Sequence, residues 1–236
     1  MRLFWPVYHL KRQARLLSRE VKIPLHQALD RIAAQEGFAS WSLLAAKAAE
    51  TGPAGRLFAQ LAPGDLLLVG ARPGQGKTLM SLELAVEAMR RGRRSVFFTL
   101  EYTQADILDR FRAIGVEPRQ FEGRFEFDSS DAISADYMVA RLTSAGAGTL
   151  VVIDYLQLLD QKRENPDLMI QVRRLRSFAR DRGLILVFIA QVDRSYELSK
   201  KPVPDIDDIR LPNPLDLSLF SKTCFLNKGE IHFQAA

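Results

Sequence analysis

Cysteine and long hydrophobic runs are almost missing from this sequence. The single cysteine among 236 residues, Cys224, excludes a disulfide framework and argues against a cysteine-based metal site. The longest apolar run, residues 184–190, has the length of a strand and not of a membrane span. The N-terminal residues show neither a long apolar core nor a small-residue cleavage site, so no signal peptide is predicted. These absences favour a protein of the reducing cytoplasm without a membrane segment.

The composition is that of an ordinary globular protein. Hydrophobic residues make up 47% of the chain, so most of it should pack into cores. The length suits one α/β domain with a small appendage. The formal net charge of +5 permits nucleic-acid binding but does not show it.

Residues 1–50 are expected to form a small helical unit, and residues 51–236 a larger domain. Apolar residues keep helical spacing in the first expected helix, at Leu10, Ala14, Leu17 and Val21. Ser40 can cap a short third helix. Basic residues lie on the other faces of the first expected helix: Lys11, Arg12, Arg15, Arg19 and Lys22. They predict either a contact with nucleic acid or a partner, or a solvated face, and the shortness of the run favours the solvated face.

The larger domain begins after a Gly- and Pro-containing boundary at residues 51–55. Apolar runs of strand length then alternate with helical patterns over about 150 residues. This alternation predicts an α/β fold, a mostly parallel sheet with helices on both faces. Two short strands, residues 217–226 and residues 231–234, are expected to end the chain.

One stretch combines an apolar run, a Gly-rich turn, Gly-Lys-Thr and a helical pattern. Backbone N–H groups of such a turn close around a phosphate, and the helix N-terminus points at the same place. Lys77 can reach the β- and γ-phosphates, and the Thr78 hydroxyl can hold Mg²⁺. The first position of the strict G-x-x-x-x-G-K-[ST] pattern is missed, and the alternative is a turn with a solvated lysine. The strand–turn–helix context favours a nucleoside triphosphate site formed by Ala71, Arg72, Pro73, Gly74, Gln75, Gly76, Lys77 and Thr78.

Polar residues stand at the carboxyl ends of three further expected strands, where ligands sit in open α/β sheets. Asp154 is a candidate Mg²⁺ ligand, and the alternative is that it only caps a turn at the end of its strand. Glu101 is a candidate general base, and the alternative is that it stands there only because the dipole of the following helix favours a glutamate. Gln191 can sense the γ-phosphate, and Arg194 follows it closely in the sequence. The alternative is that both are ordinary polar residues of a loop. We expect Glu101, Asp154 and Gln191 to converge on the phosphate loop.

Four motifs in order resemble those of the DnaB-type replicative helicases. Ala-Arg-Pro-Gly-Gln-Gly-Lys-Thr is similar to that family's phosphate loop, and Thr-Leu-Glu-Tyr to its Ser-Leu-Glu-Met segment, whose glutamate is the catalytic base. Val-Ile-Asp-Tyr-Leu-Gln-Leu-Leu resembles the second nucleotide motif, and Gln-Val-Asp-Arg-Ser the Gln-Leu-Asn-Arg-Ser segment. The resemblance implies a RecA-like core, ATP and Mg²⁺, action on single-stranded DNA, and a homo-oligomeric ring whose sites lie between subunits.

Other parts of the sequence depart from that family. The chain ends at Ala236 without the family's Lys-Gln-Arg-Asn-Gly-like segment, which supplies an arginine finger in that family. We therefore expect a C-terminally shortened relative. Its hydrolysis of ATP should be slow unless Arg210 takes the place of that arginine. The family's N-terminal collar is also not found. Residues 133–137 and 160–165 are candidate DNA-binding loops by position alone, without aromatic residues interleaved with basic ones.

Two functions follow from these residues. The first is a compact DnaB-like ATPase that acts on DNA as a helicase or translocase. The second is an ATP-dependent switch or adapter that does not unwind DNA and binds a protein partner through residues 1–50. A small-molecule kinase of the P-loop class is disfavoured, because the segments around Glu101 and Asp154 follow the helicase pattern.

Overall fold

The computed structural model of the protein describes residues 7–160, 165–199, 201–211 and 213–235. The chain divides into two compact units, Met1–Arg56 and Leu57–Ala236. Among the described residues, no helix is both long enough and apolar enough to cross a lipid bilayer.

The smaller unit is a set of three helices, α1 (Val7–Val21), α2 (Leu25–Gln35) and α3 (Trp41–Thr51). The Ser40 hydroxyl accepts a hydrogen bond from the Leu43 N–H at 3.4 Å and caps α3 as predicted. Val21 differs from the expectation, because it is 46% exposed at the last residue of α1, where the chain turns away. The unit has its own core, formed by Leu10, Ala14, Ala28, Ile32, Ala33 and Leu44.

The larger unit is built on a seven-stranded sheet in the order β3-β2-β4-β5-β1-β6-β7. All neighbouring pairs are parallel except the antiparallel pair β6 and β7. The mostly parallel sheet is therefore confirmed. The strands are β1 (Leu66–Ala71), β2 (Ser95–Thr99), β3 (Phe125–Asp128), β4 (Leu150–Asp154), β5 (Ile185–Gln191), β6 (Lys222–Asn227) and β7 (Glu230–Ala235).

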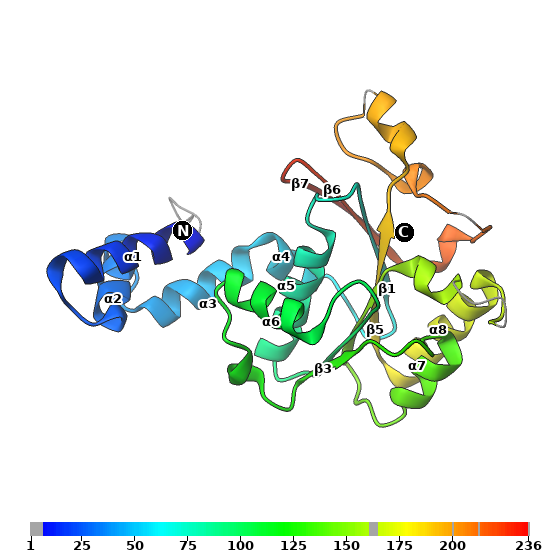
Figure 1. The fold of residues 1–236 in the computed structure, drawn as a ribbon, viewed down its shortest axis with the longest axis horizontal. Helices are drawn as coiled ribbons and strands as arrows, with labels where there is room; N and C mark the ends of the chain where they lie inside the picture. The colour runs from blue at the N-terminus through cyan, green and yellow to red at the C-terminus, as the bar shows by residue number, and fades with distance from the viewer. Residues whose placement is uncertain (1–6, 161–164, 200, 212, 236) are drawn as a thin grey trace. The chain divides into compact units, whose positions relative to one another are not determined.

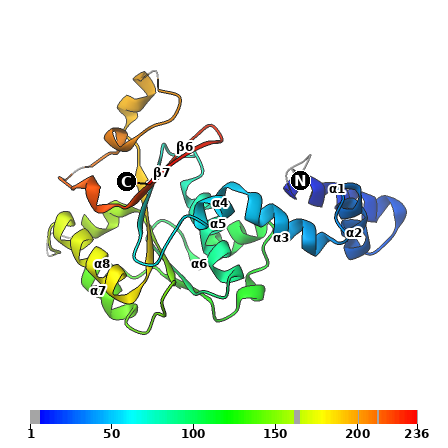
Figure 2. The same cartoon turned by 180° about the vertical axis from the view of Figure 1, so that it is seen from behind.

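Helices cover both faces of this sheet. Figures 1 and 2 show α5 and α6 on one face and α7 and α8 on the other. Alternate residues of the buried strands point to opposite faces, so both helix layers receive an apolar surface. The α-helices are α4 (Pro53–Phe58), α5 (Lys77–Arg90), α6 (Gln104–Ala113), α7 (Ala135–Arg141) and α8 (Leu168–Arg182). The 3₁₀ helices are η1 (Pro118–Phe121), η2 (Leu156–Asp160), η3 (Arg194–Leu198), η4 (Ile206–Asp208) and η5 (Leu217–Leu219).

Two segments differ from the secondary structure expected from the sequence. Part of the expected boundary turn forms α4. The expected strand within residues 217–226 begins only at Lys222, because the residues before it form η5. The Asp216 carboxylate accepts a hydrogen bond from the Ser218 N–H at 3.0 Å and so favours a tight turn over an extended strand.

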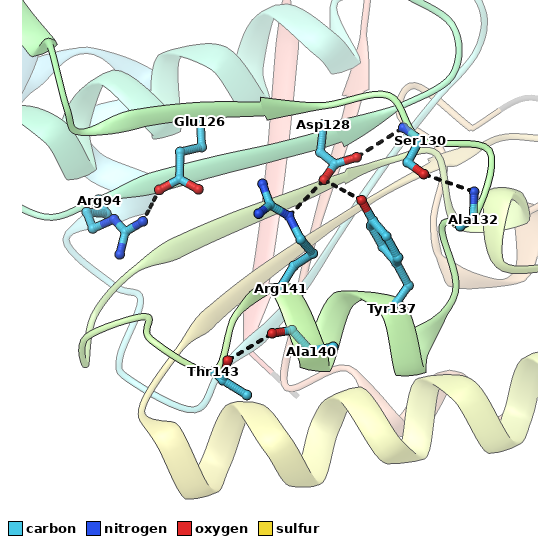
Figure 3. Close-up of polar contacts among 9 residues, drawn as sticks. All are labelled: Arg94, Glu126, Asp128, Ser130, Ala132, Tyr137, Ala140, Arg141 and Thr143. Atoms are coloured by element: carbon cyan, nitrogen blue, oxygen red, sulfur yellow. Dashed lines mark hydrogen bonds and ion pairs between the residues drawn. The ribbon is translucent and has the colours of Figure 1, made fainter.

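The segment between β3 and α7 is held by a buried carboxylate, shown in Figure 3. Asp128 ends β3 and accepts hydrogen bonds from the Tyr137 hydroxyl at 2.9 Å and the Arg141 Nε at 3.1 Å. Ile133 and Ala135 are buried in the core. Residues 133–137, a candidate DNA-binding loop by position, therefore include the start of α7, where Asp136 is exposed, and their contact with DNA stays a prediction. Most of the other candidate loop, residues 161–164, lies outside the described residues.

Candidate functional site

The carboxyl ends of the central strands meet at one cavity. Ala71 at the end of β1 pairs in register with Gln191 of β5, and Thr99 at the end of β2 pairs with Asp154 of β4. A cavity of about 510 Å³ opens at this edge. Its lining includes Lys77, Thr78, Glu101, Asp154 and Gln191. The predicted convergence of these side chains is confirmed, whereas their individual roles remain predictions.

Two glycines shape the loop between β1 and α5. Gly74 and Gly76 have φ angles of 76° and 89°, in the left-handed region that favours glycine. A Cβ atom at either position would have no heavy atom within 4 Å, so conformation and not crowding demands glycine here. Gly76 is the N-cap of α5. The loop and helix thus have the arrangement that binds phosphate groups through backbone N–H groups.

Thr78 and Asp154 are in direct contact. The Thr78 hydroxyl donates a hydrogen bond to the Asp154 carboxylate at 3.2 Å. Asp154 is only 1% exposed. Burial, followed by the nearby negative charge of Glu101, raises the pKa of Asp154 to about 7, against the smaller opposing effects of Thr78 and Lys77. A carboxylate held in this way lacks sufficient positive charge nearby, and a divalent cation would supply it.

Lys77 lies in the same cavity. Its Nζ donates a hydrogen bond to the main-chain oxygen of Arg72 at 3.4 Å. Burial lowers the pKa of Lys77, while Asp154 and Glu101 act in the opposite direction. An anion in the cavity would favour the charged form of this lysine.

Glu101 and Gln191 reach the cavity from the ends of β2 and β5. Glu101 is exposed, and its N–H donates to the Thr99 hydroxyl at 3.0 Å, which fixes the turn after β2. Gln191 is half-buried, and its main-chain oxygen accepts a hydrogen bond from the Arg210 N–H at 2.8 Å. The segment that follows β5 is therefore attached to the strand end that carries the glutamine.

Pro73, Gly74 and Gly76 also line this cavity, whereas the remaining residues of the predicted site do not. Ala71 is fully buried in β1, whereas Arg72 and Gln75 line a neighbouring cavity of about 390 Å³. Arg72 is ion-paired with Glu197 at 2.7 Å. Arg194 begins η3, is exposed, and is not among the described residues that line either cavity.

Tyr102 and Arg110 also line the main cavity, although none of the sequence motifs includes Arg110 or gives Tyr102 a role. The Arg110 guanidinium lies over the Tyr102 ring, 4.4 Å from its centroid. Tyr102 directly follows Glu101, and Arg110 lies two turns into the helix that Thr103 caps. The Thr103 cap predicts where α6 begins, but no signal in the sequence places Arg110 at the cavity.

The oxygen groups at the cavity suit Mg²⁺ better than a metal held by protein ligands alone. Across the described ranges, no three His, Cys, Asp or Glu side chains gather as a metal site. Thr78 and Asp154 provide one hydroxyl and one carboxylate. Mg²⁺ characteristically takes few protein oxygens and completes its shell with water and substrate phosphates, and these residues fit that mode.

The fold and the phosphate loop define a RecA-like P-loop NTPase, as the sequence resemblance implied. A family model described as "ATPase: KaiC" matches residues 60–206. The chain therefore belongs to the KaiC ATPase family.

Curated relatives are similar to part of the chain. A probable plasmid replicative DNA helicase of Chlamydia trachomatis is 25% identical over 181 residues, which cover 64% of this chain and 40% of that protein. The DNA repair protein RadA of Brucella abortus is 27% identical over 146 residues, 58% of this chain and 30% of that protein. The chain thus spans well under half the length of these relatives. The matches confirm the resemblance to DnaB-type proteins.

Solved structures share the fold. A DnaB-like replicative helicase, described together with its interactions with primase, has a TM-score of 0.60 at 16% identity and covers 92% of this chain and 66% of its own. A KaiC-like protein of Pyrococcus horikoshii has a TM-score of 0.52 at 15% identity, with coverages of 69% and 70%. At these identities the likeness concerns the fold alone.

Proposed function

We propose that this protein hydrolyses ATP with Mg²⁺ and uses the cycle to act on DNA, as a helicase or translocase. One observation carries the proposal. The first turn of α5, the turn after β2 and the ends of β4 and β5 bring five side chains to a single cavity at the carboxyl edge of the sheet: Lys77, Thr78, Glu101, Asp154 and Gln191. Membership of an ATPase family supports the nucleotide part of the proposal.

Each residue has a role that its position supports. The phosphate loop binds the triphosphate, and Lys77 neutralises β- and γ-phosphate charge in a partly buried site, where charges interact strongly. Thr78 and Asp154 would hold Mg²⁺, which when bound offsets the charge on the phosphate oxygens. Glu101 accepts a proton from the attacking water.

Gln191 is proposed to report the γ-phosphate to the segment after β5. Its side chain lines the cavity, while its main-chain oxygen is bonded to the Arg210 N–H. A shift of the strand end upon loss of the γ-phosphate would therefore move the segment that contains η3 and η4.

The DNA part of the proposal is supported by the relatives, whose names are those of replicative DNA helicases and of a DNA repair protein. Because the chain spans 40% of the length of the helicase relative, its own action on DNA has to be measured. Steady-state ATP hydrolysis by the purified chain, with and without single-stranded DNA, tests it alongside the mass in solution. Stimulation by DNA in an oligomer would support a ring-forming motor.

The second candidate is an ATP-dependent switch without unwinding activity. It is favoured by the separate core of the smaller unit, whose helices α1, α2 and α3 lie outside the segment matched by the family model. This unit could then receive a protein partner. ATP binding by a monomer that does not respond to DNA would favour the switch and overturn the motor.

A further inference from the structure

The net positive charge of this protein is confined to its smaller unit. Residues 1–56 hold nine Lys and Arg against four Asp and Glu, whereas residues 57–236 hold 24 basic and 24 acidic residues. The whole formal charge of +5 therefore belongs to the unit that the family model does not cover. The ATPase unit alone has no net charge with which to attract a polyanion.

The charge in the smaller unit is further concentrated on one face of α1. With 3.6 residues per turn, Lys11, Arg12, Arg15 and Arg19 fall within an arc of about 100°. We call these four basic residues the α1 stripe. Leu10, on the other side of the helix, is 1% exposed and packs into the core of the unit. The basic arc is therefore the side of α1 that faces away from the core.

The arginines of the α1 stripe are available to a ligand. Arg12, Arg15 and Arg19 are exposed, and within the described part of the chain none of the three has an ion-pair partner. Arginines of α8 differ, since Arg174 is ion-paired with Asp136 at 2.5 Å. Like charges one turn apart on a helix repel one another, and a bound polyanion would remove that cost.

The spacing of the α1 stripe suits a nucleic-acid backbone. From Lys11 to Arg19 the helix advances about 12 Å at 1.5 Å per residue. One strand of duplex DNA advances about 3.4 Å of helix axis per phosphate, so a stripe of this length spans more than one phosphate. Residues 11–19 include no aromatic residue, so contact with phosphates and not base reading is expected.

We infer that the α1 stripe is a sequence-independent binding surface for the phosphate backbone of nucleic acid. This inference rests on the proposed action on DNA and adds where the chain holds the polymer. The neutral ATPase unit would then be supplied with DNA by the smaller unit.

Fluorescence anisotropy of a labelled single-stranded oligonucleotide, titrated with the full chain at several salt concentrations, tests the inference. The triple variant Arg12→Gln, Arg15→Gln and Arg19→Gln should weaken binding at least about tenfold at low salt. It should also lower the slope of log affinity against log salt by about two, since each lost single-strand phosphate contact removes about 0.7. Glutamine keeps a high helix propensity, and far-ultraviolet circular dichroism checks that α1 remains helical.

The matched control removes the same charge from another surface helix, by Arg173→Gln, Arg176→Gln and Arg180→Gln in α8. It should bind the oligonucleotide nearly as the unaltered chain does. Equal losses in both variants would mean that net charge alone matters, and would overturn the inference.

The remaining outcomes separate this inference from the proposed function. If the unaltered chain binds DNA and the α1 variant binds equally well, the α1 stripe is not the surface, while action on DNA still stands. If the unaltered chain binds no oligonucleotide, both ideas fail. Displacement of the oligonucleotide by polyglutamate at equal charge concentration would overturn the choice of nucleic acid over an acidic protein.

Discussion

The two units of this protein place their charged groups in opposite ways. In the larger unit, Lys77 and Asp154 are held inside a cavity, with charges of both signs close together. In the smaller unit, the arginines of the α1 stripe lie on the surface and share one sign. Buried charges act strongly over short distances on one ligand, whereas exposed charges act weakly over longer distances and are screened by salt.

The difference teaches what each unit can do. A cavity with shifted pKa values and convergent side chains can bind and transform a small anion such as a nucleoside triphosphate. An exposed stripe of like charges can bind a polymer of opposite charge. Variants that alter one unit at a time can separate the two properties, and they are taken from the largest expected effect to the smallest.

Lys77→Ala should have the largest effect, because the triphosphate loses its buried positive partner. We expect ATP turnover to fall by at least about 10²-fold, the lower end of the cost of removing one preorganised donor that stabilises the charge of a transition state. Binding of oligonucleotide should be unchanged. Phosphate release and DNA anisotropy measured on the same preparation check both statements.

Lys228→Ala is the matched control for this lysine. Lys228 lines the neighbouring cavity, and its hydrogen bond to Gln75 is made by the main-chain N–H, which alanine keeps. Normal turnover by Lys77→Ala would remove the phosphate loop from the proposed chemistry.

Glu101→Gln should keep ATP binding and slow hydrolysis by about 10²- to 10⁴-fold, the range typical of a lost general base. The amide has nearly the same shape but does not accept the proton of the attacking water. Binding of a fluorescent ATP analogue and steady-state turnover separate the two effects. The exposed residue Glu122 provides the control, Glu122→Gln. Hydrolysis at the normal rate by Glu101→Gln would mean that another group is the base.

Leu44→Ala should affect the smaller unit alone. Leu44 is 0% exposed in the core of that unit, and truncation of a buried leucine costs about 2–5 kcal/mol. We expect the three helices to become protease-sensitive and DNA binding to weaken, while the basal ATPase rate is kept. Leu43, which is 56% exposed, gives the neighbouring control Leu43→Ala. Loss of both activities together would show that the units do not act separately.

Glu83→Gln should have the smallest effect, on stability alone. Burial and then the charge of Glu87 raise the pKa of Glu83 above its ordinary value of 4.5, while Arg90 acts oppositely. The folded state therefore binds this proton more tightly than the unfolded state, and stability falls as the pH rises above about 4.5. The glutamine variant should melt at a higher temperature than the unaltered chain at pH 8, with a smaller difference at pH 5. Parallel melting curves with no difference at pH 8 would contradict this reasoning.

Much of the larger unit could be predicted from the sequence because its signals are local. The β-branched and apolar runs of the central strands, the Gly-Lys-Thr start of α5 and the Thr103 cap of α6 each depend on neighbours in the chain. The convergence of Glu101, Asp154 and Gln191 also followed, because parallel strands carry their carboxyl ends to one edge. The role of each side chain did not follow from spacing.

Gly70 illustrates what spacing could not reveal. It lies within β1, and a Cβ atom there would come within 2.6 Å of the Phe225 ring of β6. The need for glycine thus depends on a strand more than 150 residues away. The ion pair between Arg72 and Glu197 is another contact between distant segments, and both residues line the neighbouring cavity of about 390 Å³.

The sequence by itself determined the phosphate loop, the alternation of strands and helices, and the amphipathic helices of the smaller unit, since these follow from backbone conformation and residue periodicity. Only the tertiary structure decided the strand order, the hydrogen bond between Thr78 and Asp154, the contact of Tyr102 with Arg110, and the exposure of the arginines of α1. Those features depend on which distant surfaces pack together and which remain in water. The burial of apolar surface over the whole chain decides this, and no local pattern records it.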